Sequence, residues 1–283
     1  MASQTLRAAL GGTLYRVERP WGDIAAGHGL ISDVACDARG HVFVLIRRDT
    51  YTDADAAAVV ELDSDGKRLA AWGGADIADG HMLAVAPDGR VFVVDRDAHQ
   101  IVIFDRHGRR QAALGTRHTP GAPFNHPSGV AIAPWGDIYV ADGYGAHRIH
   151  RFAAGLTPLG SWGEPGAGPG QFSTPHSLWC TDDGRVLVTD RENDRVQAFD
   201  RQGGFLAAWG GHYRAMDVFQ NEAGIYVTDQ VPRLSLLAPD GSLISTCRPV
   251  LNGGHGVWVD GAGRIYLAEL NPTRITRLVP DPG

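Results

Sequence analysis

Residues 83–95 read LAVAPDGRVFVVD, two apolar runs joined by a tight Asp-Gly turn. The same pattern recurs as VAIAPWGDIYVAD in residues 130–142 and as LWCTDDGRVLVTD in residues 178–190. Apolar runs on both sides of a glycine-containing turn are a strong signal for a β-hairpin. These segments therefore predict hairpins at nearly regular intervals along the chain.

A fixed period relates these hairpins to one another. A third apolar strand follows the hairpin, as in HQIVIFD (residues 99–105), and a fourth follows a second turn, as in GKRLAAWG (residues 66–73). Four short strands per unit of this length are typical of propeller blades. The sequence predicts an all-β, six-bladed β-propeller that occupies residues 1–283 as a single domain. The turn glycines lie 49, 47, 48, 40 and 39 residues apart, at Gly40, Gly89, Gly136, Gly184, Gly224 and Gly263.

The ends of the chain predict how the ring closes. The last unit stops without a strand that ends in Trp-Gly, whereas residues 13–22, TLYRVERPWG, supply such a strand at the N-terminus. We expect residues 13–22 to complete the sixth blade and residues 1–12 to form an N-terminal tail. Closure of this kind leaves only short, protected sheet edges.

Charged residues that recur in most units are interpreted as structural, because chemistry is expected where blades differ. Their repeated positions indicate that they hold loops. Acidic residues stand six positions after the turn glycine at Asp95, Asp142, Asp190 and Glu269. Arginines precede the third strand at Arg148, Arg195, Arg233 and Arg274.

Three histidines occupy one slot of the repeat in alternate units, eight residues before the turn glycine. They are His81, His176 and His255; the same slot in the other units holds Ser32, Ser128 and Met216. In a closed propeller of six blades, this alternation places three imidazoles around the central channel. Three histidines with an open fourth position are the usual ligand set of a catalytic zinc. The sequence therefore predicts a metal site.

The composition excludes several classes of function. The formal net charge is −6, and no cluster of lysine and arginine indicates binding to nucleic acid or to an anionic membrane. No apolar stretch reaches membrane-spanning length, and the N-terminus does not resemble a secretory signal. Cys36, Cys180 and Cys247 are scattered and odd in number, so we expect free buried thiols and a cytoplasmic protein.

Another slot, seven residues after the turn glycine, differs between blades. It holds Arg47, Arg96 and Arg191 in three units, and Gly143 in the third, where Tyr144 follows. An arginine there can bind a carboxylate through two parallel hydrogen bonds, or form a surface ion pair with a neighbouring acid. Tyr144 can pack as a loop aromatic or direct its hydroxyl group toward the histidines.

Two segments carry a family resemblance. They are FNHPSGVAI…VADGYGAHRI (residues 124–149) and SWGEPGAGPGQFSTPHSL…VTDRENDRVQAF (residues 161–199). The chain resembles the NHL-repeat propellers and, among them, the peptidyl-α-hydroxyglycine α-amidating lyases. The likeness runs from about Val34 to Leu278. It implies a metal-dependent lyase that cleaves the C–N bond of an α-hydroxyglycine carbinolamide to give an amide and glyoxylate.

The resemblance also implies roles for individual residues. His81, His176 and His255 match the three zinc ligands of the family, and Tyr144 matches its catalytic tyrosine. Arg47 and Arg191 match active-site arginines. Zinc would act as a Lewis acid, and iron, cobalt or manganese also suit such ligands. Tyr144 would take the hydroxyl proton, Arg191 would supply positive charge beside it, and Arg47 would clamp the carboxylate.

The chain departs from the family pattern at several positions. Gly256 stands where the family has an aspartate that helps to hold a structural calcium, which weakens the expectation of Ca²⁺; Asp33, beside Val34, is the candidate replacement. The disulfide cysteines are missing, since DGYC of the family reads DGYG here. Arg96 has no counterpart. Together Arg47, Arg96 and Arg191 predict a small substrate that bears a carboxylate rather than a long peptide.

Two alternatives remain open at this stage. The same three-histidine site suits a zinc-dependent hydrolase or hydratase, in which zinc-bound hydroxide attacks the substrate. A non-catalytic propeller that binds a protein or peptide would explain the blades but not the alternating histidines.

Overall fold

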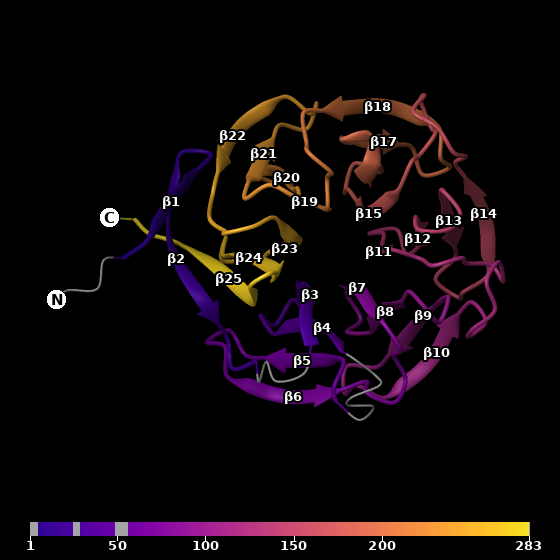
Figure 1. The fold of residues 1–283 in the computed structure, drawn as a ribbon, viewed down its shortest axis with the longest axis horizontal. Coiled ribbons are helices and arrows are strands. Elements are labelled where there is room, and N and C mark those ends of the chain that lie inside the picture. Colours follow the sequence, from indigo (N-terminus) through magenta and orange to yellow (C-terminus); the bar gives the residue numbers. More distant parts are fainter. Residues whose placement is uncertain (1–4, 25–28, 49–55, 283) are drawn as a thin grey trace.

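Six antiparallel sheets surround a central channel in the computed structural model, which describes residues 5–24, 29–48 and 56–282 (Figure 1). This arrangement confirms the predicted six-bladed propeller. Within these ranges the only helix is the 3₁₀ turn η1 (Arg191–Asn193), and no helix is long and apolar enough to cross a membrane. The three cysteines are buried and free, as expected.

The strands of each blade run in order from the channel outward. Blade 1 contains β3 (Gly29–Cys36), β4 (Val42–Arg48), β5 (Val59–Leu62) and β6 (Arg68–Trp72). Blade 2 contains β7 (Gly80–Val85), β8 (Val91–Asp95), β9 (Gln100–Phe104) and β10 (Arg110–Leu114). Blade 3 contains β11 (Gly129–Ile132), β12 (Ile138–Asp142), β13 (Arg148–Phe152) and β14 (Pro158–Trp162).

The remaining blades repeat this order, and the sixth combines both ends of the chain. Blade 4 contains β15 (Pro175–Cys180), β16 (Val186–Asp190), β17 (Arg195–Phe199) and β18 (Phe205–Gly210). Blade 5 contains β19 (Asp217–Asn221), β20 (Gly224–Thr228), β21 (Leu234–Leu237) and β22 (Leu243–Cys247). Blade 6 contains β23 (Gly254–Val259), β24 (Ile265–Leu270), β25 (Thr273–Pro280), β2 (Thr13–Trp21) and β1 (Arg7–Leu10).

Burial follows the position of a strand within its blade. The second strands of blades 2 to 5, such as β8 and β12, are buried along their whole length, because neighbouring blades cover both faces of each sheet. Outer strands such as β14 are mostly exposed. The core therefore lies between adjacent blades, where Phe92, Tyr139 and Tyr266 are fully buried.

The ring closes as the sequence predicts, with one correction. Strand β2 pairs antiparallel with β25, with Val17 opposite Leu278. Part of the predicted tail is also a strand, since Arg7–Leu10 forms β1 on the outer edge of β2. The reason is the Gly11-Gly12 pair, a two-residue hairpin turn in which both residues have positive φ. Residues 1–4 of the predicted tail lie outside the described residues.

The recurring acids hold the loops that lead into the innermost strands. Asp95 accepts hydrogen bonds from the backbone N–H groups of Ala78 and Asp79, at 3.0 and 2.9 Å, and is fully buried. Asp142, Asp190 and Glu269 bond the corresponding loops in their own blades. Arg148 differs from the other recurring arginines, because it bonds the Ser161 hydroxyl group rather than the acid. These anchored loops fix the start of the innermost strand in blades 2, 3, 4 and 6.

Candidate metal centre

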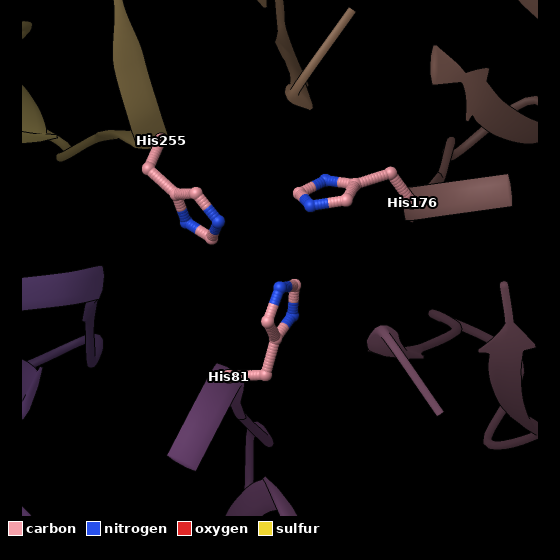
Figure 2. Close-up of side chains that lie close together, drawn as sticks. All are labelled: His81, His176 and His255. Atoms are coloured by element: carbon pink, nitrogen blue, oxygen red, sulfur yellow. The ribbon is translucent and has the colours of Figure 1, made fainter. Parts of the chain in front are cut away.

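Each of the three histidines lies at a β-bulge in the innermost strand of its blade. The register against the second strand shifts at His81 in β7, at His176 in β15 and at His255 in β23. A bulge interrupts the alternation of side chains and redirects the extra residue. The three imidazoles accordingly point toward one another in the channel (Figure 2).

The imidazoles form a nearly symmetric ring. Their centroids are 4.9 Å apart for His81 and His176, 5.0 Å for His81 and His255, and 5.1 Å for His176 and His255. One ligand atom from each lies within 4.8 Å of the others, and the side chains are buried. In the described part of the chain, they are the only such group of three or more His, Cys, Asp or Glu side chains. The group could hold a metal ion.

Hydrogen bonds on one nitrogen determine the tautomer of each ring. A carbonyl oxygen only accepts, so each Nδ1 must donate, and each Nε2 then carries the lone pair that a metal requires. The acceptor is the carbonyl of the residue in the same slot of the next blade, which also confirms Met216 as the slot residue of blade 5. The distances are 2.6 Å from His81 to Ser128, 2.7 Å from His176 to Met216 and 2.7 Å from His255 to Ser32.

Burial keeps the imidazoles in the form that binds metal. It lowers the pKa of His81 and of His176 well below the ordinary imidazole value, and the positive charge of neighbouring imidazoles and arginines lowers both further. Burial lowers the pKa of His255 to about 4. The three rings are therefore neutral near pH 7, and no proton has to leave before a cation binds.

The Tyr144 hydroxyl group lies directly against this ring. Its oxygen is 2.9 Å from Nε2 of His81 and 3.1 Å from Nε2 of His176. Nη1 of Arg191 donates to the same oxygen at 3.1 Å. Of the two orientations that the sequence left open for Tyr144, the structure shows the one directed at the histidines.

Two arginines lie over the ring of the tyrosine. The guanidinium carbons of Arg96 and Arg191 lie 5.3 and 5.2 Å from the centre of the Tyr144 ring, within the range of cation–π attraction. Arg47 lies close enough for its charge to lower the pKa of His81, after burial and the other imidazoles. The structure thus brings all of the sequence-predicted site residues to one end of the channel.

Comparison with known proteins finds one NHL repeat and several similar amidating enzymes. An NHL repeat model matches residues 124–152. The peptidyl-alpha-hydroxyglycine alpha-amidating lyase 1 of Drosophila melanogaster is 29% identical over 76% of this chain and 47% of its own length. The peptidylglycine alpha-amidating monooxygenase of Rattus norvegicus is 29% identical over 64% of this chain. The chain is a six-bladed propeller that contains one NHL-repeat match and is similar to the amidating lyases.

Other matches set the limits of that resemblance. The chain spans only 22% of the length of the rat monooxygenase. The NHL repeat-containing protein 3 of Mus musculus is 28% identical over 87% of the chain and 78% of its own length. A gluconolactonase from Xanthomonas campestris superimposes with a TM-score of 0.74 over 99% of the chain and 96% of its own, at 15% identity, which shows the shared fold alone.

The buried carboxylates of Asp33 and Asp217 lie one residue beyond the histidine slot, in the next layer of the channel. Asp33 is buried and accepts N–H bonds from Val34 and Leu83, at 2.8 and 2.9 Å. A Cβ atom on Gly256 would lie 2.0 Å from its Oδ1. The Asp33 carboxylate therefore occupies the space that a side chain at position 256 would need.

Asp79 is the site residue that the sequence analysis missed. Nε of Arg47 donates to its Oδ1 at 2.9 Å, Nη2 of Arg47 to its Oδ2 at 3.1 Å, and Nη2 of Arg96 contacts Oδ2 at 2.8 Å. The two-pronged carboxylate contact expected of Arg47 is thus made within the protein. Asp79 stands two residues before His81, but it belongs to no repeated slot that would have marked it.

Proposed function

We propose that the protein is a zinc-dependent lyase that cleaves the C–N bond of an α-hydroxyglycine-type carbinolamide, HO–CH(COO⁻)–NH–C(O)R, to an amide and glyoxylate. One observation carries the proposal: the Tyr144 hydroxyl group contacts two of the three converging imidazoles and Arg191. A three-histidine ring alone suits many reactions, whereas a tyrosine at the same point adds a group that can transfer a proton. Similarity to proteins named as amidating lyases supports this proposal.

The imidazoles fit zinc by ligand type, by their converging Nε2 atoms and by the backbone carbonyls that accept from Nδ1. Zinc held there supplies a Lewis acid that acidifies a nearby hydroxyl group. His81, His176 and His255 would be its protein ligands, and the backbone carbonyls that accept from Nδ1 keep the three rings oriented.

Tyr144 performs the proton transfer in this proposal. In its phenolate form, Tyr144 accepts the proton of the substrate hydroxyl group on its oxygen, and the O–H electron pair forms the C=O bond of glyoxylate. The C–N bond breaks, its electron pair moves to nitrogen, and the tyrosine returns the proton there to complete the amide. Arg191 stays hydrogen-bonded to the tyrosine oxygen, while Nη1 of Arg47, which has no partner among the described residues, binds the substrate carboxylate.

The test combines metal analysis with an assay of glyoxylate release from N-benzoyl-α-hydroxyglycine. Wild-type protein should contain about one zinc per chain and release glyoxylate, and His176→Ala should lose both. His107→Ala, which alters an exposed turn histidine, is the matched control and should retain both. Wild-type protein that neither contains nor takes up zinc would refute the proposal.

The products separate the lyase from a hydrolase on the same histidines. A lyase yields benzamide together with glyoxylate, whereas attack of zinc-bound hydroxide on the amide yields benzoate. Benzamide as the sole aromatic product supports the lyase. Benzoate in its place would assign the site to hydrolysis.

A further inference from the structure

Three arginines border the site, although the proposed reaction uses two of them. Arg96 is the third, and it comes from the end of β8 in blade 2, next to the blade that carries Tyr144. Its guanidinium lies over the Tyr144 ring at 5.3 Å. A cation placed at this point needs an explanation beyond proton transfer.

The contacts of Arg96 orient its guanidinium and leave one edge free. Nε donates to Asp97 at 2.9 Å, and Nη2 contacts Asp79 at 2.8 Å. Nη1 makes no hydrogen bond to any described residue. Arg47 bonds the same Asp79 through Nε and Nη2, so its Nη1 is free as well. One carboxylate therefore holds two guanidinium groups, each with donors left over.

Asp79 is itself fixed in place. Its backbone N–H donates to Asp95 at 2.9 Å, and Asp95 is fully buried. Gln100 also donates to Asp95, at 3.0 Å. The pair of arginines is thus held by a rigid loop before any ligand arrives, and this preorganisation lowers the ordering cost of binding.

The free donors of this cluster belong to partly buried cationic groups. The side chains of Arg47 and Arg96 are both 23% exposed, whereas that of Asp79 is 14% exposed. Asp79 and Asp97 balance the two guanidinium charges in formal count, but the Asp97 side chain is 53% exposed and its charge is screened by water. Nη1 of each arginine has no hydrogen-bond partner among the described residues and can bind an anion.

We propose that Arg96 is a subsite for a second carboxylate, so that the preferred substrate is a dicarboxylate: an α-hydroxyglycine whose N-acyl group ends in a carboxylate. The identity of the first carboxylate rests on the proposed lyase function. Arg47 binds the α-carboxylate and Arg96 binds the terminal one. The Asp79 bridge sets the separation of the two, and this separation selects the length of the acyl group.

A binding measurement tests the subsite without relying on turnover. Isothermal titration of zinc-loaded protein would compare glutarate with glutaramate, its monoamide, which has nearly the same shape and one charge fewer. Wild-type protein should bind glutarate at least about tenfold more tightly, the size expected for a charge-assisted bidentate contact. Arg96→Gln should reduce this ratio to less than about threefold, and Arg96→Lys should give an intermediate ratio, because lysine keeps the charge but loses the planar fork.

Arg110→Gln is the matched control, since it removes one positive charge from the exposed strand β10 of the same blade. It should leave the ratio unchanged. Equal binding of the two ligands by wild-type protein would overturn the subsite, as would absence of binding at millimolar concentration or an unchanged ratio in Arg96→Gln.

A pair of substrates separates this proposal from the lyase function. N-succinyl-α-hydroxyglycine and its terminal amide should differ at least about tenfold in kcat/KM, in favour of the dicarboxylate. Equal rates of glyoxylate release would retain the lyase and overturn the subsite. If neither compound releases glyoxylate but glutarate is preferred in wild type and not in Arg96→Gln, the subsite stands and the lyase function fails.

Discussion

Two layers of buried polar side chains lie one residue apart in the innermost strands, and they differ in what their hydrogen bonds leave free. In the first layer, Nδ1 of each imidazole is bonded to a backbone carbonyl, and the Nε2 atoms converge, with those of His81 and His176 beside the Tyr144 hydroxyl group. In the second layer, Asp33 and Asp217 have both carboxylate oxygens bonded. Asp217 accepts from the backbone N–H groups of Val218 and Val257 and from the Ser177 hydroxyl group.

This difference shows why equal burial does not mean equal function. A buried polar group that is fully bonded within the protein is explained by the fold, because leaving it unbonded would be costly. A buried group whose lone pairs converge with those of its neighbours requires a ligand for its explanation. The histidine layer is of the second kind and the acid layer is of the first.

Tyr144→Phe should give the largest effect, because it removes the hydroxyl group that contacts His81, His176 and Arg191 and that transfers the proton in the proposed reaction. Proton transfer by a positioned side chain contributes about 10²- to 10⁴-fold to a rate, and kcat for glyoxylate release should fall by that factor. Zinc content should stay the same, since the three imidazoles remain. Tyr213→Phe, at an exposed tyrosine, should leave kcat at the wild-type value; a Tyr144→Phe enzyme with full activity would remove Tyr144 from the mechanism.

Asp217→Ala should affect stability rather than chemistry. It leaves two backbone donors and one hydroxyl group buried without their acceptor, and at about 1 kcal/mol or more for each, the free energy of unfolding should fall by about 3 kcal/mol. Urea denaturation of zinc-free protein measures this loss. Asp240→Ala, at an exposed turn of the same blade, should cost much less. Equal losses in the two variants would mean that the acid layer does not hold the channel together.

The periodic part of this structure could be predicted from the sequence. The turn glycines set the blades, and the alternation of histidine with Ser32, Ser128 and Met216 placed three imidazoles in one ring. This worked because a closed propeller converts equal positions along the chain into equal positions around an axis.

The rest could not be predicted, because it depends on contacts that have no period. Asp79 binds Arg47 from a different blade, and no repeated slot identifies it. The Asp33 carboxylate fills the space that a side chain at Gly256 would need, although Gly256 lies 223 residues further along the chain. The two positions meet only in the closed ring, so their spacing in the sequence does not indicate the contact. The strand β1 was not predicted for another reason: the Gly11-Gly12 pair was not interpreted as a hairpin turn.

Gly256→Asp tests whether positions 33 and 256 share one space in the acid layer. The new Cβ atom would lie 2.0 Å from Oδ1 of Asp33 and 3.1 Å from its Cα, so the free energy of unfolding should fall by about 1–3 kcal/mol through overpacking. The combined variant Asp33→Gly/Gly256→Asp should recover part of this loss, because a carboxylate returns to the same space. Chemical denaturation of the four proteins in a double-mutant cycle measures the coupling, and additive losses would show that the two positions do not share one space.

The pH dependence of stability should show the smallest effect, because the two layers act in opposite directions. Burial raises the pKa of Asp217 to about 6, so its contribution is complete below the unfolded value of about 3.9 and is lost as the pH rises through 6. Burial lowers the pKa of His255 to about 4, so its contribution is complete above the unfolded value of about 6.5 and is lost as the pH falls toward 4. Between pH 4 and 6 the two contributions to stability partly cancel in zinc-free protein.

Asp217→Asn should make the slope of the unfolding free energy against pH more positive, and His255→Asn should make it more negative, each by at most about 1.4 kcal/mol per pH unit. Denaturation series at several pH values measure these slopes, and parallel curves for all three proteins would show that neither layer titrates as its burial requires.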